Sequence, residues 1–182
     1  MTLKLMKNKP VVIICGDPES TFNEILIKTL KSKAFRNFKF PIIIICSEKL
    51  FQNELKKLKT KINLQKFENQ NKLLNNKIYI IDIPLKKGNL SLLKKNEYIK
   101  KSFDVGLNLL KRNNSFALIN GPISKTTFLK GKFKGITEYL AFKTKSINEV
   151  MLIFNKELSV CPITTHVPIN KVSQKIKKEV IF

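Results

Sequence analysis

Short runs of apolar, mostly β-branched residues alternate along this chain with longer segments whose apolar residues recur at helical spacing. The first run, residues 11–15, is continuous and ends at the turn-forming sequence Gly16-Asp17-Pro18. Ser20 and Thr21, which are typical helix N-caps, then precede side chains spaced three or four positions apart. These side chains are Phe22, Ile25, Leu26 and Leu30. The pattern predicts a buried strand, a loop and a helix.

This unit of strand and helix repeats further along the chain. Residues 41–46 form a second apolar run, and Ser47 then caps an amphipathic segment. Residues 78–83 form a third run, and a helical stripe over residues 103–110 leads into a fourth run at residues 116–119. Strands joined by crossover helices form a largely parallel sheet, so the sequence predicts an α/β fold.

The last third of the chain has a different pattern. Two apolar runs, residues 150–154 and 158–163, flank the polar residues 155–157 and predict a pair of strands. Residues 173–182 start at helical spacing and end on an apolar triplet with no C-terminal cap, as expected of a helix cut short. The lysine-rich residues 84–96 predict an ordered surface loop, and we expect a single domain.

The net charge is strongly positive, at +22, with 35 Lys plus Arg against 13 Asp plus Glu. Such a charge ordinarily indicates a nucleic-acid or other anionic partner. Here the charge is nearly all lysine, dispersed over the chain, with no Arg-rich tract and no interleaved aromatic platform. The pattern favours lysine-rich solvated faces, and nucleic-acid binding stays a competing hypothesis that the salt dependence of affinity would test.

The three cysteines and the N-terminal segment bear on the cellular compartment. Cys15, Cys46 and Cys161 are widely spaced inside or beside apolar runs, so we expect reduced, buried thiols. The first apolar run is too short for a signal peptide or a membrane span. We therefore expect a cytoplasmic protein without a membrane partner.

Polar motifs follow three of the predicted strands, where loops converge and helix N-termini offer unpaired N–H groups to anions. In Gly16-Asp17-Pro18, glycine allows close backbone approach and Asp17 can orient a ligand, but an ordinary strand-to-helix turn also favours these residues. In residues 120–125, Lys125 can pair with a phosphate or a carboxylate, or be one more solvated lysine.

The third motif, Thr164-Thr165-His166, carries the only histidine of the chain. A neutral imidazole can bind a divalent metal or shuttle a proton, although a lone histidine more often does neither. No cluster in the sequence completes a metal site or a catalytic pair. The residues alone therefore indicate an α/β domain able to bind an anion.

The order and wording of these motifs resemble the 4-hydroxythreonine-4-phosphate dehydrogenase family. The stretches that carry the resemblance are Gly16-Asp17-Pro18, residues 120–125, Gly135-Ile136-Thr137-Glu138, Val150-Met151-Leu152 and residues 164–168. The resemblance implies an α/β/α sandwich of the isocitrate dehydrogenase type with a mostly parallel sheet. It also implies an oxidoreductase that uses NAD to oxidise and decarboxylate 4-phosphooxy-L-threonine to 3-amino-2-oxopropyl phosphate, in pyridoxine 5'-phosphate (vitamin B6) biosynthesis.

The resemblance also implies roles for individual residues. His166 matches a ligand of the family's divalent metal, Zn, Mg or Co, which polarises the substrate hydroxyl. Thr137 matches a substrate contact, and we expect Lys125 and Asp17 to belong to the catalytic machinery. Ile136 stands in the substrate-binding motif where the family has histidine, which leaves the identity of the phosphorylated hydroxy acid open.

The length of the chain departs from the family, whose members are roughly twice as long. The resemblance implies that residues 1–182 are the N-terminal part, with an incomplete fold and the C-terminal NAD-binding and metal-ligand part absent. His166 alone cannot complete a three-histidine site, even in a homodimer. We expect a homodimer or pairing with the missing half, and exposed apolar surface that makes the isolated chain marginally stable. The competing hypotheses are a catalytically inactive fragment and a remnant that only binds phosphate esters.

Overall fold

A computed structural model describes residues 9–68, 73–85, 91–111, 115, 117–147 and 149–178. The chain divides into two compact units, Met1–Phe128 and Leu129–Phe182. The expectation of a single domain stays a prediction, and each unit is described by itself. The boundary falls in a turn-rich stretch whose composition does not differ from that of the flanking sequence, so no linker signal marks it.

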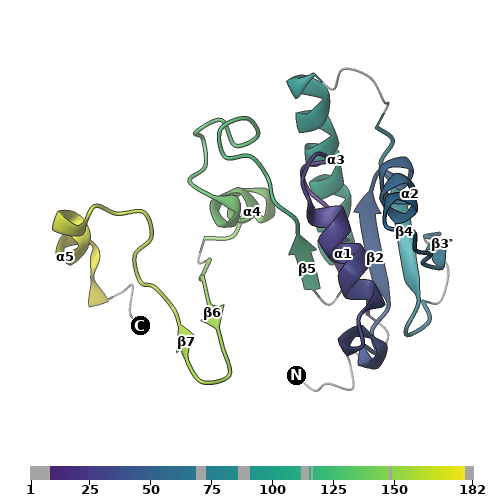
Figure 1. The fold of residues 1–182 in the computed structure, drawn as a ribbon. Helices are drawn as coiled ribbons and strands as arrows, with labels where there is room; N and C mark the ends of the chain where they lie inside the picture. Colours follow the sequence, from purple (N-terminus) through teal and green to yellow (C-terminus); the bar gives the residue numbers. More distant parts are fainter. Residues whose placement is uncertain are drawn as a thin grey trace. The chain divides into compact units, whose positions relative to one another are not determined.

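The first unit is built on a parallel sheet, which confirms the predicted α/β class (Figure 1). Its strands are β1 (Val11–Ile14), β2 (Ile42–Cys46), β3 (Leu64–Lys66), β4 (Ile78–Asp82) and β5 (Ala117–Asn120). They lie in the order β3-β4-β2-β1-β5, and every neighbouring pair is parallel. Strand β3 escaped prediction because it is short and at the edge, and its sequence Leu-Gln-Lys forms no apolar run.

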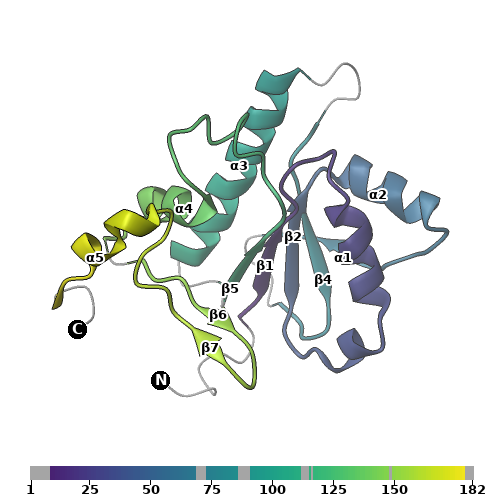
Figure 2. The ribbon, with the colours of Figure 1, turned by 60° about the vertical axis from the view of Figure 1, so that its left-hand side comes forward.

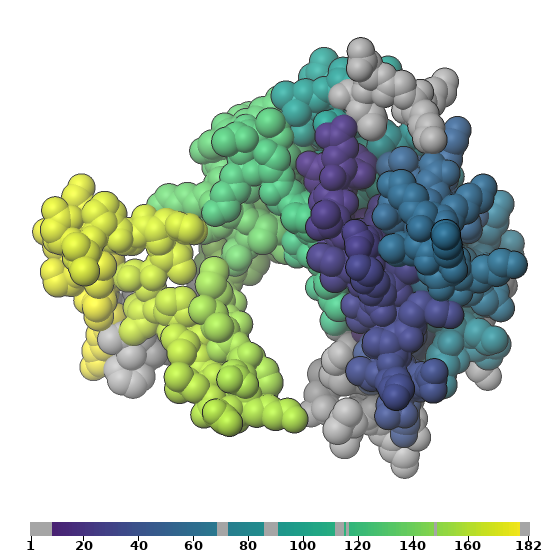
Figure 3. Space-filling model, viewed as in Figure 1, coloured from purple at the N-terminus to yellow at the C-terminus, as the bar shows by residue number. Residues whose placement is uncertain are grey.

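Helices cover both faces of this sheet, as the α/β/α prediction requires. Helices α1 (Phe22–Lys31) and α2 (Glu48–Lys57) cover one face, and α3 (Leu92–Lys111) covers the other (Figure 2). In the space-filling view, atoms of α1 and α2 hide the sheet behind them (Figure 3). The helix α3 approaches closely at Gly106, where an added Cβ would lie 2.8 Å from Ile14 Cδ1.

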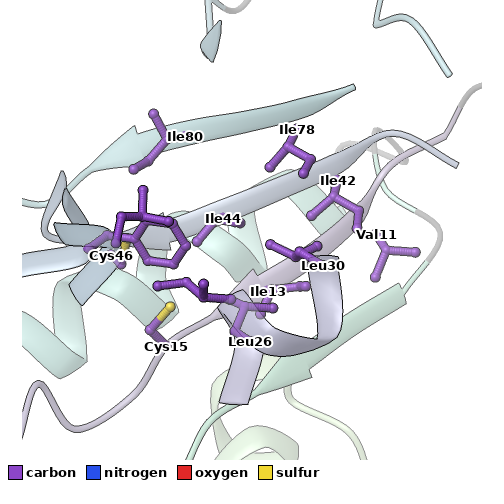
Figure 4. Packing of buried hydrophobic residues seen from close by; sticks show 13 residues of the cluster. Val11, Ile13, Cys15, Leu26, Leu30, Ile42, Ile44, Cys46, Ile78 and Ile80 are labelled. Atoms are coloured by element: carbon purple, nitrogen blue, oxygen red, sulfur yellow. The ribbon is translucent and has the colours of Figure 1, made fainter. Parts of the chain in front are cut away.

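The core between the sheet and helices α1 and α2 is made of alternate strand residues, because successive side chains in a strand point to opposite faces. Figure 4 shows this cluster from close by. It contains Val11, Ile13, Ile42, Ile44, Cys46, Ile78 and Ile80 from the strands, Cys15 from the position directly after β1, and Leu26, Ile27, Leu30, Phe51 and Leu55 from the helices. The intervening strand residues pack toward α3, so both faces of the central strands are buried.

The start of α3 corrects the predicted surface loop. Residues 92–96 belong to the helix rather than to a loop, while residues 86–90, including Gly88, lie outside the described part of the chain. The first turn carries exposed Leu92 and Leu93 among polar residues, and the buried stripe begins only at Tyr98. A helix end that buries little has no apolar periodicity to reveal it.

The second unit contains α4 (Ile136–Thr144), the antiparallel strands β6 (Ile153–Phe154) and β7 (Ser159–Val160), a 3₁₀ turn η3 (Ile169–Lys171) and α5 (Val172–Lys175). The predicted strand pair is confirmed, although both strands are short. Apolar side chains are exposed here, as expected from the sequence for a chain without the rest of the fold, with Phe154 at 73% and Leu158 at 68%. The apolar triplet at residues 180–182 lies outside the described residues.

The three cysteines differ in their burial. Cys15 and Cys46 are buried free thiols as predicted, but Cys161 is exposed, so that part of the prediction is wrong. Cys161 follows β7 in the hairpin of the second unit, whose apolar residues are themselves exposed. Within the described ranges, no helix is both long and apolar enough to cross a membrane.

Candidate ligand site at the ends of strands β1 and β5

The order in which successive strands are added to the sheet reverses at β1. From β1 the chain runs through α1 to β2 on one side, whereas β5 lies on the other side of β1 and is reached through α3. The helix α1, which follows β1, and the helix α3, which precedes β5, cover opposite faces of the sheet. Open α/β sheets bind ligands at such a switch point.

The loops that follow β1 and β5 touch through their backbones. The N–H of Gly121 donates a hydrogen bond to Ile14 O at 2.7 Å, and the N–H of Asp17 donates one to Pro122 O at 2.8 Å. Two of the motifs found in the sequence, Gly16-Asp17-Pro18 and residues 120–125, are therefore brought together at one edge of the sheet.

Glycine is required at both contact points. Gly16 has a left-handed φ of +74°, and a Cβ added there would lie 2.3 Å from Pro122 O. A Cβ added at Gly121 would lie 2.2 Å from Cys15 O. Real Cβ atoms do not approach backbone oxygens so closely, so only glycine permits the two loops to meet.

The carboxylate of Asp17 organises its own loop. Asp17 Oδ1 accepts a hydrogen bond from the N–H of Glu19 at 3.0 Å, and Asp17 O accepts one from Ser20 Oγ at 2.7 Å. This is the side-chain turn that Asp commonly forms before a helix. The geometry supports the interpretation of Gly16-Asp17-Pro18 as an ordinary strand-to-helix turn. The catalytic role of Asp17 stays a prediction.

The turn after β5 presents Lys125. Ser124 Oγ accepts a hydrogen bond from the N–H of Thr127 at 3.1 Å, and Ser124 O accepts one from the N–H of Phe128 at 3.1 Å. The turn is thus fixed by its own serine, while Lys125 is exposed. Among the residues that the structure describes, no carboxylate forms an ion pair with its ammonium group. Lys125 can therefore accept an anionic ligand without breaking an internal pair.

The first turns of α3 hold both loops in position. Lys95 forms an ion pair with Glu19 of the loop after β1, and Asn96 Nδ2 donates a hydrogen bond to Thr127 O at 2.9 Å. The ring of Phe103, further along the helix, stacks on Phe128 with centroids 6.3 Å apart. The sequence did not reveal Lys95 or Asn96, because they lie in the segment predicted as a surface loop. Ser91, a residue type common at helix N-caps, was the sequence signal that could have placed the start of α3. In the structure, Ser91 Oγ accepts a hydrogen bond from the N–H of Lys94 at 3.5 Å.

The substrate residues expected from the family resemblance lie in the second unit. Gly135 is the N-cap of α4, and Ile136 and Thr137 begin the helix with half-buried side chains. A Cβ added at Gly135 would lie 3.1 Å from Glu138 Oε2, so the Glu138 carboxylate lies beside the start of the helix. An acidic side chain in the first turn stabilises the helix dipole and leaves less positive potential for an anion.

His166 lies between β7 and η3 in the same unit, exposed and with a left-handed φ of +56°. Over the described ranges, no three His, Cys, Asp or Glu side chains come close enough to hold a metal ion. With a single imidazole and no clustered carboxylate or thiolate, these residues do not fit a divalent metal site by themselves.

A separate hollow lies at the other end of α2, lined by Leu55, Lys56, Lys59, Lys61 and Ile62 among others. A helix that follows a parallel strand runs back along it, so the C-terminus of α2 is remote from the carboxyl edge of the sheet. Lysine side chains near a helix C-terminus interact favourably with its dipole. This ordinary helix chemistry accounts for the charge of the hollow.

The fold and the paired loops define an open parallel α/β unit with a candidate ligand site at the switch point of its sheet. Residues 38–182 match the family model described as pyridoxal phosphate biosynthetic protein PdxA, and the chain belongs to this family. The resemblance seen in the motifs is thereby confirmed.

Comparison with individual proteins agrees with this assignment. The chain is 31% identical over 180 residues to a 4-hydroxythreonine-4-phosphate dehydrogenase of a Sulfurihydrogenibium species, covering 94% of this chain and 54% of the relative. It is 26% identical over 178 residues to D-threonate 4-phosphate dehydrogenase of Salmonella typhimurium, covering 91% and 53%. A crystal structure of a 4-hydroxythreonine-4-phosphate dehydrogenase from Burkholderia phymatum has the same fold, with TM-score 0.78, 21% identity, and 96% and 55% coverage. The chain thus spans about half the length of its relatives.

Proposed function

We propose that this chain supplies the substrate-binding part of an NAD-dependent dehydrogenase that oxidises and decarboxylates 4-phosphooxy-L-threonine in pyridoxine 5'-phosphate biosynthesis. The observation that supports it is the family match over residues 38–182, joined to an intact pair of loops at the carboxyl edge of the sheet. Because the chain spans about half of the relatives that it matches, we propose that the NAD-binding part and the remaining metal ligands lie outside these 182 residues.

The roles proposed for individual residues follow from their chemistry. The exposed ammonium of Lys125 pairs with the substrate phosphate, and Asp17 keeps the adjoining loop in the shape that allows this contact. Thr137 contributes a hydroxyl to the substrate from the start of α4. His166 is proposed as the one metal ligand that this chain contributes. Pairing with a C-terminal half would supply the further metal ligands, whereas a homodimer would add only one more histidine.

The presence of Ile136 in place of the family's histidine leaves two candidate substrates. An apolar side chain at this position cannot form the hydrogen bond that a histidine offers, so discrimination between phosphorylated hydroxy acids is expected to change. One relative is named for D-threonate 4-phosphate, which carries a phosphate and a hydroxy acid group as the first substrate does. We propose 4-phosphooxy-L-threonine as substrate, with 4-phospho-D-threonate as the second candidate.

The test is NADH formation, followed by absorbance with NAD and Mg²⁺ or Zn²⁺, for each of the two substrates. The purified chain is assayed alone and mixed with any product of the neighbouring downstream reading frame. Activity only in the mixture supports a dehydrogenase assembled from two polypeptides. Binding of the phosphate ester without turnover in either sample would replace the proposal by the binding remnant. Full activity of the chain alone would show that it needs no further ligands.

A further inference from the structure

Two cysteines face each other across neighbouring strands at the carboxyl edge of the sheet. The β1 to β2 ladder pairs Ile14 with Ile45, and the N–H of Cys15 donates a hydrogen bond to Ile45 O at 3.2 Å. The ladder continues by one residue, so Cys15 comes to lie opposite Cys46. Paired strands run about 4.8 Å apart, a Cα separation that a disulfide can span.

Both thiols lie on the same face of the sheet, in the core under α1 and α2 (Figure 4). Cys15 is 3% exposed and Cys46 is 1% exposed, and neither forms a disulfide in the structure. Either cysteine alone would serve as an ordinary small apolar core residue. Two of them in register on adjacent strands bring two sulfur atoms within reach of one another, which no other cysteine pair among the described residues does.

We propose that Cys15 and Cys46 form a dithiol site that a small peroxide converts into an intramolecular disulfide. One thiolate attacks a peroxide oxygen, the O–O bond breaks and hydroxide leaves, which gives a sulfenic acid. The other sulfur then attacks the sulfenic sulfur, the S–O bond breaks and water leaves. Two thiols and one hydrogen peroxide give one disulfide and two waters, and two electrons pass from sulfur to oxygen. Because burial suppresses the reactivity of a thiol, the reaction requires a local opening of the first unit, and peroxide needs a smaller opening than a bulky disulfide reagent.

The disulfide would form directly beneath the loops of the ligand site. Cys15 is joined to Gly16, and its carbonyl oxygen lies so close to Gly121 that no side chain fits between them. A sulfur–sulfur bond draws Cys15 toward β2, away from this contact. The inference does not depend on the proposed enzymatic function, since it rests on the strand register and on burial alone.

The experiment uses the full chain carrying Cys161→Ser, which removes the exposed thiol that would otherwise form disulfides between molecules. The folded protein is treated with hydrogen peroxide, alkylated and digested with trypsin without reduction. Cys15 and Cys46 fall in different tryptic peptides because Lys28 and Lys39, among other basic residues, lie between them. We expect loss of both free thiols, a peptide pair joined through these cysteines, and recovery of both thiols with dithiothreitol.

Two controls decide the outcome. The same chain unfolded in urea shows that the peroxide treatment oxidises accessible thiols, and Cys46→Ala in the same background removes the proposed partner. The inference is overturned if the folded Cys161→Ser protein keeps both thiols free under conditions that oxidise the unfolded chain. It is equally overturned if the folded protein yields only disulfides between molecules or sulfinic acids. Neither result requires the Cys46→Ala variant to fold.

Discussion

The backbone N–H of Asp17 donates a hydrogen bond to the carbonyl oxygen of Pro122 at 2.8 Å, which joins the loop after β1 to the loop after β5. The two residues are far apart in sequence and belong to motifs that the sequence indicated separately. Their contact places both motifs at one edge of the sheet, in one candidate site.

Replacing Gly121 with alanine should destabilise the first unit by about 3 kcal/mol, the upper range for forcing an added carbon into packed structure. The added Cβ would lie 2.2 Å from Cys15 O, and two backbones cannot easily separate. Gly131→Ala is the matched control, because its left-handed φ of +69° is strained but no atom lies within 4 Å. That variant should lose only about 1 kcal/mol. Urea denaturation followed by circular dichroism measures both, and equal losses would refute the steric argument.

Asn96→Ala should loosen the turn that carries Lys125. The variant loses the hydrogen bond from Asn96 Nδ2 to Thr127 O, at a cost of about 1 kcal/mol. Amide hydrogen exchange at Thr127 and Phe128 should then become about fivefold faster. Asn108→Ala, at an exposed position of the same helix, is the control and should leave these rates unchanged. Unchanged exchange in Asn96→Ala would mean that Ser124 alone holds the turn.

The folded state should lose stability at alkaline pH. The hydrogen bond with Cys15 and burial raise the pKa of the Cys46 thiol, so the folded chain keeps a proton that the unfolded chain releases. The stabilisation is complete below the ordinary thiol pKa of about 8.5 and falls above it by about 1.4 kcal/mol per pH unit. Cys46→Ala should flatten this decline, whereas Cys161→Ser, at an exposed site, should not. Thermal unfolding between pH 7 and 10 measures the slopes.

Burial also raises the pKa of Tyr98, whose hydroxyl oxygen accepts a hydrogen bond from the N–H of Ser47 at 3.1 Å. The sign is the same as for Cys46, because the buried phenol stays protonated while the unfolded one ionises above about pH 10. Tyr98→Phe should therefore reduce the loss of stability above pH 10 while costing about 1 kcal/mol at neutral pH. An unchanged alkaline limb in this variant would contradict the assignment.

The sequence predicted those elements that bury a continuous apolar face. The runs that became β1, β2 and β4 are buried on both sides, so their composition reports their position directly. Strand β3 and the first turn of α3 bury little, and no apolar pattern distinguishes them from loops. Cys161 was misjudged for a related reason, since its apolar neighbours lie exposed in a hairpin.

The candidate site was predictable in part. The switch-point rule for parallel sheets brings the loops of Asp17 and Lys125 to one edge, and the structure confirms their proximity. The contributions of Lys95 and Asn96 were not predictable, because they depend on where α3 starts relative to both loops. The roles of Thr137 and His166 came from the family resemblance alone and stay predictions.

The most direct measurement is isothermal titration of the chain with 4-phosphooxy-L-threonine, compared with Lys125→Ala and with Lys101→Ala, an exposed lysine on α3. The account predicts saturable binding that inorganic phosphate competes for, weakened about 10- to 100-fold by Lys125→Ala, as expected for a lost charge-assisted contact. Lys101→Ala should bind as the original chain does. Equal weakening by both variants would contradict the account, because the ligand would then respond only to the net positive charge.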